Sequence, residues 1–459
     1  MDGKIRVLFH NLDGAGVNYF RTLTPATELE RNHSDEFYVE INPTIDFNDP
    51  TIMDYLKSFH IIHYHRQFIN DSKQMLGLAN ELRKSGTILI VDIDDYWQLH
   101  KAHPYYQMSL ENNLAAPILD NLKIADYVTT TTDLFAGEIR KVTGRDNVQV
   151  FYNSIDPTWM KQFQNNWTPD PDGRVRITYM AGSSHMGDVE QLEGVMNVLS
   201  SDPELADKFK VIIAGWDTEG NTTDITFNQE FGTELQKRNL WTKDVVKAIN
   251  NSRGDVDKIP IPQDLKDKYR GNIFDQKQRD IKSEESVYLI YEKILTDNHR
   301  MIKNADYLEW LGNYERNVQY EDEGNFARRW TQKANTYANV LNETDIVLAP
   351  LADNSFNKMK SNLKQVECWT RKLPIVCSDV APYNIHGKHM QNCVLIPNEK
   401  NSFKYWHKYL KKLILDADLR KKLGEQLYED FKEEYNLANV TKKRAEFYKA
   451  CVAKTLQLV

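Results

Sequence analysis

The sequence has few cysteines, no long apolar run and no excess of positive charge. Each of these features excludes a class of protein. The four cysteines show no CxxC spacing, which speaks against a zinc site or a disulfide framework and favours reduced, packed thiols. No stretch approaches the roughly 20 apolar residues that span a bilayer, and the N-terminus lacks an apolar run of signal-peptide length. We therefore expect a cytoplasmic protein without a transmembrane segment.

The overall charge is mildly acidic, with 58 Lys and Arg against 66 Asp and Glu and a net charge of -8. Such a chain lacks the general positive field that draws proteins to nucleic acid or to anionic membranes, although a local basic site is compatible with it. Its 459 residues, 41% of them hydrophobic, are enough for two domains with separate cores.

Short apolar, β-branched runs alternate with amphipathic segments of helical length, and this alternation predicts parallel strands joined by helical crossovers. In the first half the runs cover residues 5–9, 59–65, 87–93, 126–132 and 148–153. After a polar, turn-rich linker at 164–174 the pattern restarts, with runs at 176–182, 209–216, 344–351, 373–379 and 392–398. The sequence thus predicts an α/β protein with two doubly wound domains, at 1–163 and 174–430, and a helical tail.

The segment between about 217 and 343 is longer than an ordinary crossover, and we expect it to be a helical insertion in the second domain. Apolar and aromatic residues recur at helical spacing in 286–317 and in 326–343, as in an added subdomain with its own core. The alternative is a platform for an acceptor or a partner, built by the aromatic side chains Trp216, Trp241, Trp310 and Trp330.

In open α/β sheets, ligands bind beyond the carboxyl ends of the strands, so the residues that follow each strand are the candidates. After the first strand, Gly14 and Gly16 allow close approach of a ligand to a helix N-terminus, and Tyr19 and Arg21 add polar reach. The full dinucleotide fingerprint is absent, so a simple tight turn is the alternative.

Two neighbouring strands of the first domain end in an imidazole and several carboxylates, which could orient a hydroxyl group or accept its proton. The residues are His65, Arg66, Asp92, Asp94 and Asp95. A metal site and helix capping are the alternatives for the aspartates.

In the second domain, a small loop after the first strand leads into a helix, which suits a phosphate. It is formed by Gly182, Ser183 and Ser184, and His185 and Asp188 project from the first helical turn. A serine-capped helix without a ligand is the alternative.

The run FNKMKSNLKQVE carries the highest local concentration of positive charge. Lys360, Lys364 and Glu367 follow one another at spacings of four and three, which predicts one shared helix face. Two ammonium groups at a strand end would form an anion site of pyrophosphate size, and the carboxylate could accept a pair of sugar hydroxyls. A solvated surface helix with an i, i+3 ion pair is the alternative.

Together these features resemble the GT-B glycosyltransferases of the large retaining group, which use nucleotide sugars. The resemblance covers residues 5–216 and 344–459, and its most specific piece is the run NK-x-KS-x-LK-x-x-E. It implies two Rossmann-like domains facing a cleft, with the acceptor on the first and the donor on the second. It also implies that a C-terminal helix at 431–459 crosses back to the first domain, and that the sugar is transferred with retention.

Carried over by position, the resemblance implies that Lys360 and Lys364 hold the donor diphosphate, Glu367 the ribose, and Gly182 to His185 the phosphate or sugar. Ser361, Gly14 and Gly16 belong to the same donor set, whereas Tyr19, Arg21, Arg66, Asp92 and Asp95 are expected on the acceptor side. Catalysis is expected to depend on His65, which would touch the transferred sugar, and on Asp94 and Lys364.

One position departs from the family pattern, because Met359 stands where a second, sugar-binding glutamate is usual. Asp353, Asn354 or Asn357 are candidates to replace its contacts. A non-catalytic sugar-nucleotide-binding scaffold is therefore an alternative function, as are a sugar phosphorylase or epimerase and a glycosyltransferase acting on hydroxymethylpyrimidine bases in DNA.

The leaving group of such a reaction is a nucleoside diphosphate, expected to be UDP. Lysines and helix dipoles can neutralise its developing charge, so we expect no metal ion and no cofactor besides the donor. The expected partners are a nucleotide sugar and a glycan, lipid-linked or nucleic-acid acceptor.

Overall fold

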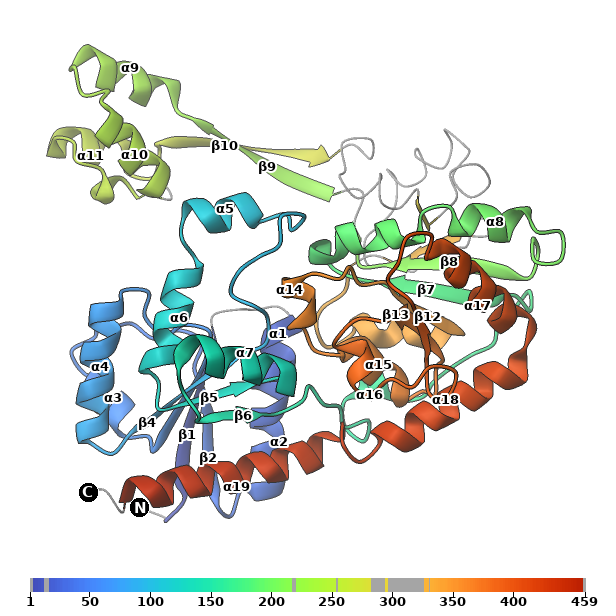
Figure 1. Ribbon diagram of the computed structural model, residues 1–459. Coiled ribbons are helices and arrows are strands. Elements are labelled where there is room, and N and C mark those ends of the chain that lie inside the picture. The colour runs from blue at the N-terminus through green and yellow to red at the C-terminus, as the bar shows by residue number, and fades with distance from the viewer. Residues whose placement is uncertain are drawn as a thin grey trace. The chain divides into compact units, whose positions relative to one another are not determined.

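The structure, a computed structural model, describes residues 3–11, 16–216, 220–252, 255–281, 294–295, 326–329 and 331–456. Two six-stranded parallel sheets dominate it, as Figure 1 shows. The strand order is β2-β1-β3-β4-β5-β6 in the first sheet and β11-β8-β7-β12-β13-β14 in the second. The predicted α/β architecture with two doubly wound sheets is confirmed.

The N-terminal sheet is built from β1 (Ile5–His10), β2 (Phe37–Ile41), β3 (Ile61–His65), β4 (Ile88–Ile93), β5 (Tyr127–Thr130) and β6 (Val148–Val150). Its helices are α1 (Gly16–Asn18), the π-helix η1 (Tyr19–Leu23), α2 (Thr24–His33), α3 (Ile52–Lys57), α4 (Ser72–Lys84), α5 (Tyr106–Glu111), α6 (Ala115–Ile124), α7 (Asp133–Thr143) and the 3-10 helix η2 (Lys161–Phe163).

Alternating side chains of β1 serve the two faces of this sheet, as the two-residue period of a strand requires. Val7 and Phe9 join one apolar cluster, and Leu8 joins the cluster on the other face. Helix α4 covers the second face with Met75, Leu78, Ala79 and Leu82, all buried at helical spacing. Its N-terminus is capped by Asp71, which accepts a hydrogen bond from the Gln74 backbone N–H.

The C-terminal sheet is built from β7 (Val175–Met180), β8 (Phe209–Ala214), β11 (Phe326–Arg329), β12 (Ile346–Ala349), β13 (Ile375–Ser378) and β14 (Val394–Ile396). Its helices are η3 (Ser183–Leu192), α8 (Val195–Ser201), η6 (Tyr337–Glu343), α14 (Ser355–Lys358), α15 (Leu363–Trp369), α16 (Tyr383–His386), α17 (Phe403–Leu415) and α18 (Ala417–Phe431), with η3 and η6 of the 3-10 type.

Helix α19 (Leu437–Leu456) packs against α2 and β4 of the N-terminal part, although it follows the C-terminal sheet in sequence (Figure 1). Ala445, Tyr448 and Cys451 complete the apolar cluster to which Val7 and Phe9 belong. The Tyr448 hydroxyl also lies 2.7 Å from Nδ1 of the buried His63. The last helix is therefore part of the core of the first sheet.

A separate compact unit comprises residues 217–289 and 305–314. In it, β9 (Gly220–Phe227) and β10 (Phe274–Ile281) form an antiparallel pair in which Gly220 lies opposite Ile281. Helices α9 (Gln229–Lys237), α10 (Lys243–Ser252), η4 (Val256–Lys258) and α11 (Gln263–Tyr269) lie between these strands in sequence. An apolar cluster that includes Phe231, Leu235 and Leu265 gives this unit its own core.

The helical prediction for the insertion is wrong in part. Residues 326–329 form β11, a strand parallel to β8, instead of the start of a helix, and 337–343 form a 3-10 helix. The strand pair β9–β10 was also not expected. Trp216 is buried and Trp241 is exposed, whereas the predicted helix at 286–317, apart from residues 294–295, and Trp310 and Trp330 lie outside the described residues.

The other compositional expectations can be compared directly with the structure. All four cysteines are buried and free, as predicted. Among the described helices, none has an apolar stretch long enough to cross a bilayer.

Candidate active site

Two segments that follow strands of the C-terminal sheet meet around one buried carboxylate, that of Asp188 in η3. Its Oδ2 lies 2.8 Å from Nδ1 of His185. Its Oδ1 accepts hydrogen bonds from the Ala352 backbone N–H and from Nδ2 of Asn357, each at 2.8 Å. Asp188 thus fixes the loop after β7 to the loop after β12. The N-cap of η3 is Gly182, so the alternative of a serine-capped helix does not hold.

The same contacts define the protonation of His185. A carboxylate can only accept hydrogen bonds, so Nδ1 of His185 carries the proton and donates it to Asp188. The other ring nitrogen, Nε2, is left as an acceptor. The Nζ of Lys360 lies 3.4 Å from Nε2. Burial, followed by the charge of Lys360, lowers the pKa of His185 below its ordinary value. A neutral His185 therefore stands beside a cationic lysine.

Lys360 and Lys364 do not share one helix, so the prediction from their spacing is wrong in its geometry. Helix α14 ends at Lys358 and α15 begins at Leu363, which leaves Lys360 in the connection. Both lysines nevertheless act on the pKa of His185, so their ammonium groups lie in the same neighbourhood. Neither side chain is fully exposed.

Glu367 lies one turn further along α15 and is 1% exposed. The Lys364 Nζ donates to its Oε2 at 2.8 Å, and the Tyr337 hydroxyl donates to its Oε1 at 2.5 Å. Burial, together with the carboxylate of Glu367, raises the pKa of Tyr337 well above its ordinary value, so the hydroxyl keeps its proton. The i, i+3 ion pair is present, but it is buried instead of solvated.

The N-terminal sheet presents a second group of polar residues at the ends of β3 and β4. His65 Nε2 lies 2.9 Å from Oδ1 of Asp94, and Nη2 of Arg66 lies 3.3 Å from Asp94 and from Asp95. Burial alone would raise the pKa of Asp94, but the charges of His65 and Arg66 outweigh it and hold that pKa well below its ordinary value. Asp94 is therefore an ionised hydrogen-bond acceptor.

The backbone at this strand end is unusual. Arg66 has a φ of 58°, in the left-handed region that non-glycine residues rarely occupy, and its N–H donates to the Asp92 carbonyl at 2.7 Å. Such strain is held where the surrounding structure over-determines it. Here it lies at the residue that directly follows β3.

Arg21 and Asp92, both predicted to bind an acceptor, are instead bound to one another in the interior. Arg21 donates from Nε and Nη2 to the two oxygens of Asp92 at 2.9 and 2.7 Å, and from Nη1 to the Phe151 carbonyl at 2.7 Å. The two residues are 1% and 2% exposed. This burial contradicts a direct contact with an acceptor and assigns the pair to the framework under the site.

Tyr19 is also buried, and it packs in the apolar cluster of the C-terminal sheet next to Phe20. Its predicted role in acceptor binding is therefore not supported by its exposure. The cluster also contains Ile155, Met160 and Phe163, which precede the predicted domain boundary. The first domain thus contributes residues to the core of the second.

The glycines and serines of the predicted donor site differ in what surrounds them. A Cβ built on Gly16 or Gly182 would meet no atom within 4 Å, so open space lies above both backbones. Ser184 is partly exposed, and Ser361 accepts a hydrogen bond from Nδ2 of Asn153 at 2.9 Å, which links it to the N-terminal half. Gly14 lies outside the described residues, and of Ser183 only the backbone is described.

Two residues that sequence reasoning missed lie among these groups. Tyr337 was assigned to a packed helix, and nothing in its local sequence indicates its bond to Glu367. His103 lies in the loop after β4, where its ring meets the edge of Phe356 at a centroid distance of 5.4 Å. Met359, which replaces the usual glutamate, packs against an apolar cluster of the N-terminal sheet.

In the part of the chain that the structure describes, no group of three or more His, Cys, Asp or Glu side chains is arranged to hold a metal ion. The aspartates of the DIDD run are engaged by Arg21, His65 and Arg66 instead.

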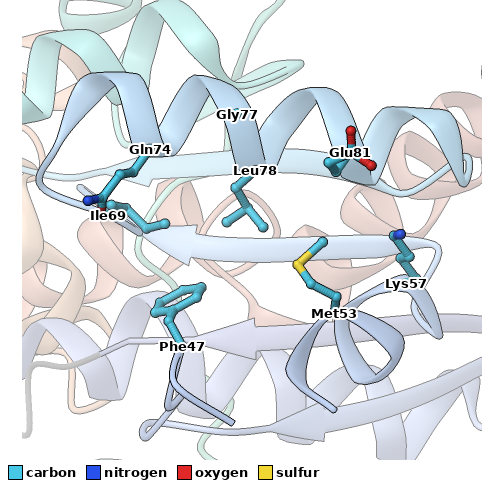
Figure 2. Close-up of a pocket in the computed structure, with 8 residues that line it drawn as sticks. All are labelled: Phe47, Met53, Lys57, Ile69, Gln74, Gly77, Leu78 and Glu81. Atoms are coloured by element: carbon cyan, nitrogen blue, oxygen red, sulfur yellow. The ribbon is translucent and has the colours of Figure 1, made fainter. Parts of the chain in front are cut away.

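A cavity of about 430 Å³ lies elsewhere, between α3 and α4 (Figure 2). Phe47, Met53, Ile69 and Leu78 form its apolar lining, and Lys57 and Glu81 contribute charged groups. None of the candidate site residues lines it, so it is separate from the candidate site.

Two parallel α/β sheets, with candidate site residues at the carboxyl ends of strands from both and a last helix that returns to the first, define the GT-B fold. Solved structures with this fold confirm the assignment. Sucrose-phosphate synthase from Thermosynechococcus elongatus matches with a TM-score of 0.55 over 98% of this chain and 100% of that one, at 10% identity.

Two further structures are similar to the same extent. HepE from Anabaena, solved with UDP and glucose, has a TM-score of 0.51, with 97% of this chain and 100% of that chain covered at 10% identity. A glycosyltransferase from Rickettsia africae ESF-5 has a TM-score of 0.52, with 98% and 99% covered at 11% identity. No protein-family model and no curated protein matches the sequence.

Proposed function

We propose that this protein is a glycosyltransferase that moves a sugar from a nucleotide-diphosphate sugar, expected to be UDP-linked, to an acceptor hydroxyl. The observation that carries the proposal is the placement of two partly buried ammonium groups, those of Lys360 and Lys364, beside a neutral His185. Lys364 is paired with Glu367, whereas the described residues supply no ion pair for Lys360, so partial burial strengthens the attraction of Lys360 to an anion. The GT-B fold and the UDP bound in the structure of HepE support a nucleoside diphosphate as that anion.

The chemistry follows from the charge that develops as the sugar leaves. The glycosidic bond to the diphosphate breaks, and negative charge accumulates on the departing β-phosphate. Lys360 and Lys364, fixed in advance by Phe356 and Glu367, would stabilise that charge without reorganisation. The new bond forms between the anomeric carbon and the acceptor oxygen, whose proton needs a base.

The ionised Asp94, held by His65 and Arg66, is the proposed group on the acceptor side. It would orient the acceptor hydroxyl by accepting a hydrogen bond, with His65 positioned to touch the transferred sugar. Because the low pKa of Asp94 makes it a weak base, the hydroxyl proton would pass to the departing phosphate oxygen. Retention of configuration rests on the resemblance to the retaining group. Arg21 and Asp92 would hold the ends of the neighbouring strands in place without touching substrate.

Glu367 is proposed to accept hydrogen bonds from the ribose hydroxyls. Glu367 is 1% exposed, so the ribose hydroxyls would reach Oε1 or Oε2 as the side chain of Tyr337 or Lys364 moves aside. Tyr337→Phe is expected to weaken UDP binding several-fold, as measured by calorimetry, because the carboxylate loses one of its two orienting donors.

The decisive experiment is a turnover assay with a panel of nucleotide sugars, in which nucleoside diphosphate release and product mass are measured with and without candidate acceptors. Lys364→Ala is expected to lower kcat/KM by about a hundredfold or more. Lys358→Ala is the matched control, because this lysine belongs to the same segment but is 44% exposed and paired with Asp353. Equal activity of wild type and Lys364→Ala would overturn the assignment.

Metal independence is part of the proposal, because the two lysines supply the positive charge that a divalent ion would otherwise provide. Turnover is expected to be unchanged in excess EDTA. Complete loss of turnover under these conditions, with recovery on addition of Mg²⁺, would contradict it.

A second candidate function is binding of a nucleotide sugar without transfer. Met359, packed against an apolar cluster where a sugar-binding glutamate is usual, favours it. UDP-sugar binding without turnover for any donor and acceptor in the panel would support this second function over the first.

A further inference from the structure

The loop after β4 contains two histidines in the same local conformation. The backbone N–H of Ala102 donates to Nδ1 of His100 at 3.3 Å, and the backbone N–H of Tyr105 donates to Nδ1 of His103 at 3.1 Å. In both rings Nδ1 is therefore an acceptor, and the neutral form carries its proton on Nε2. Each histidine presents an N–H donor away from its own backbone.

Their surroundings differ. His100 is exposed, whereas His103 is partly buried against Phe356, which belongs to the C-terminal half. The face of the same Phe356 ring carries Lys360, with Nζ 4.8 Å from the centroid. His103 and Lys360 are thus held on one aromatic side chain, and the described part of the chain supplies no hydrogen-bond partner for His103 Nε2.

The ionisable groups that act on His103 come from both halves of the protein. Lys360 and His185 act from the C-terminal side, and Asp95 and Arg66 act from the strand ends of the N-terminal sheet. Ala102 packs against Gly187 of η3, because a Cβ added to Gly187 would lie 3.4 Å from the Cβ of Ala102. The loop after β4 therefore contacts η3, the helix that carries His185. His103 is therefore within electrostatic range of Lys360 and of Asp95.

We propose that His103 is a diphosphate-binding residue, whose Nε2–H donates to a phosphate oxygen of the nucleotide held by Lys360. The inference rests on the proposed function and extends it, because it makes the loop after β4 part of the donor site. The ligand chemistry is set by Lys360, because an oxygen shared between an ammonium group and an imidazole N–H is anionic in preference to a neutral sugar hydroxyl. The leaving group would then be held from both halves of the protein.

The test compares binding of UDP and of uridine, measured by calorimetry, to wild type and three variants. His103→Phe keeps an aromatic ring against Phe356 but removes the donor, and it is expected to weaken UDP binding about tenfold while leaving uridine binding unchanged. His103→Gln retains an N–H near the position of Nε2 and is expected to recover most of the affinity for UDP.

His100→Phe is the matched control, because it makes the same substitution in the same loop conformation away from Phe356. It is expected to bind UDP like wild type. Circular dichroism of each variant verifies that it is folded.

The outcomes separate this inference from the proposed function. Wild type that binds UDP together with His103→Phe that binds it equally well would overturn the role of His103 alone. Weakened binding of both UDP and uridine by His103→Phe would also overturn it, because the effect would not be specific to the diphosphate. Failure of wild type to bind UDP or any other nucleoside diphosphate would remove the proposed function itself.

Discussion

At the scale of single residues, the ion pair between Arg21 and Asp92 shows how position at a strand end can serve structure instead of ligand binding. The guanidinium of Arg21 donates hydrogen bonds to both carboxylate oxygens of Asp92, and also to the Phe151 carbonyl and to Asn153 Oδ1. Thr129 donates a further bond to Asp92 at 2.5 Å. Because the network is buried, its contribution depends on the presence of both charges.

Asp92→Asn is therefore expected to lower the free energy of unfolding by about 3 kcal/mol, because Arg21 is left as an uncompensated buried charge. The double variant Arg21→Met/Asp92→Leu removes both charges and is expected to be more stable than either single variant. Urea denaturation followed by circular dichroism measures both effects. A double variant less stable than Asp92→Asn would contradict this account.

The same pair predicts a pH dependence. Burial alone raises the pKa of Asp92, but the charge and hydrogen bonds of Arg21 lower it to about 2. A folded-state pKa below the unfolded value of about 3.9 gives stability that is present above pH 4 and is lost as the pH falls towards 2.

The difference in unfolding free energy between wild type and Asp92→Asn is thus expected to shrink by about 1 kcal/mol between pH 7 and pH 3. Urea midpoints at a series of pH values measure it. A difference that is constant or grows towards low pH would show that Asp92 is not stabilised as an anion.

At the scale of elements, helix α19 stabilises a sheet to which it does not belong in sequence. Its Tyr448 is fully buried between Phe9, Phe37 and His63, and its hydroxyl bonds to the imidazole of His63. On the same helix, Lys449 is 42% exposed and paired with Glu36 at the surface. Substitutions of Tyr448 and of Lys449 therefore test core packing and surface charge separately.

Tyr448→Ala is expected to destabilise the protein by about 3 to 5 kcal/mol, and Tyr448→Phe by about 1 kcal/mol through loss of the hydrogen bond. Lys449→Ala is the control and is expected to change the unfolding free energy by less than about 0.5 kcal/mol. Thermal and urea unfolding measure these values. Equal effects of the two alanine variants would show that α19 is not part of the core.

The central strands were predictable because they are short apolar runs between helical segments, as β3, β4, β7 and β8 illustrate. Two edge strands were not. Only one of the five residues of β2 is buried, and β11 has only four residues, in a stretch whose apolar spacing also fits a helix. Local pattern carries little information where few side chains of a strand are buried, as in β2, or where its apolar spacing also fits a helix, as in β11.

The candidate site was predictable in composition but not in geometry. His185, Lys360, Lys364 and Glu367 do meet, but through a break in the helix at 359–362 that the spacing argument did not foresee. Tyr337 and His103 join the group from distant parts of the chain. Their roles depend on tertiary contacts, to Glu367 and to Phe356, which no local motif encodes.

At the scale of the whole molecule, the separate compact unit that contains β9 to β10 has its own apolar core and one pair of antiparallel strands. Gly220 and Ile281 are paired, so the intervening chain starts and ends at neighbouring positions. A deletion that reached residue 342 would also remove β11 from the C-terminal sheet. Residues 221–280 are therefore the correct limits for testing what this unit does.

Replacement of residues 221–280 by a short Gly-Ser turn is expected to leave a folded protein that binds UDP like wild type, because none of the proposed donor residues lies in the removed segment. If the unit selects the acceptor, which is the alternative raised by its aromatic side chains, the shortened protein is expected to hydrolyse donor while transferring to a different set of acceptors. Calorimetry and product mass measure the two properties. An unchanged acceptor range would assign the unit another role.

The return of α19 to the first sheet also has a consequence for biosynthesis. Translation makes β1 to β6 before the whole C-terminal sheet and α19 only after it, so the apolar face that α19 covers stays open while the C-terminal sheet is synthesised. The first sheet therefore completes its core only after α19 has been made.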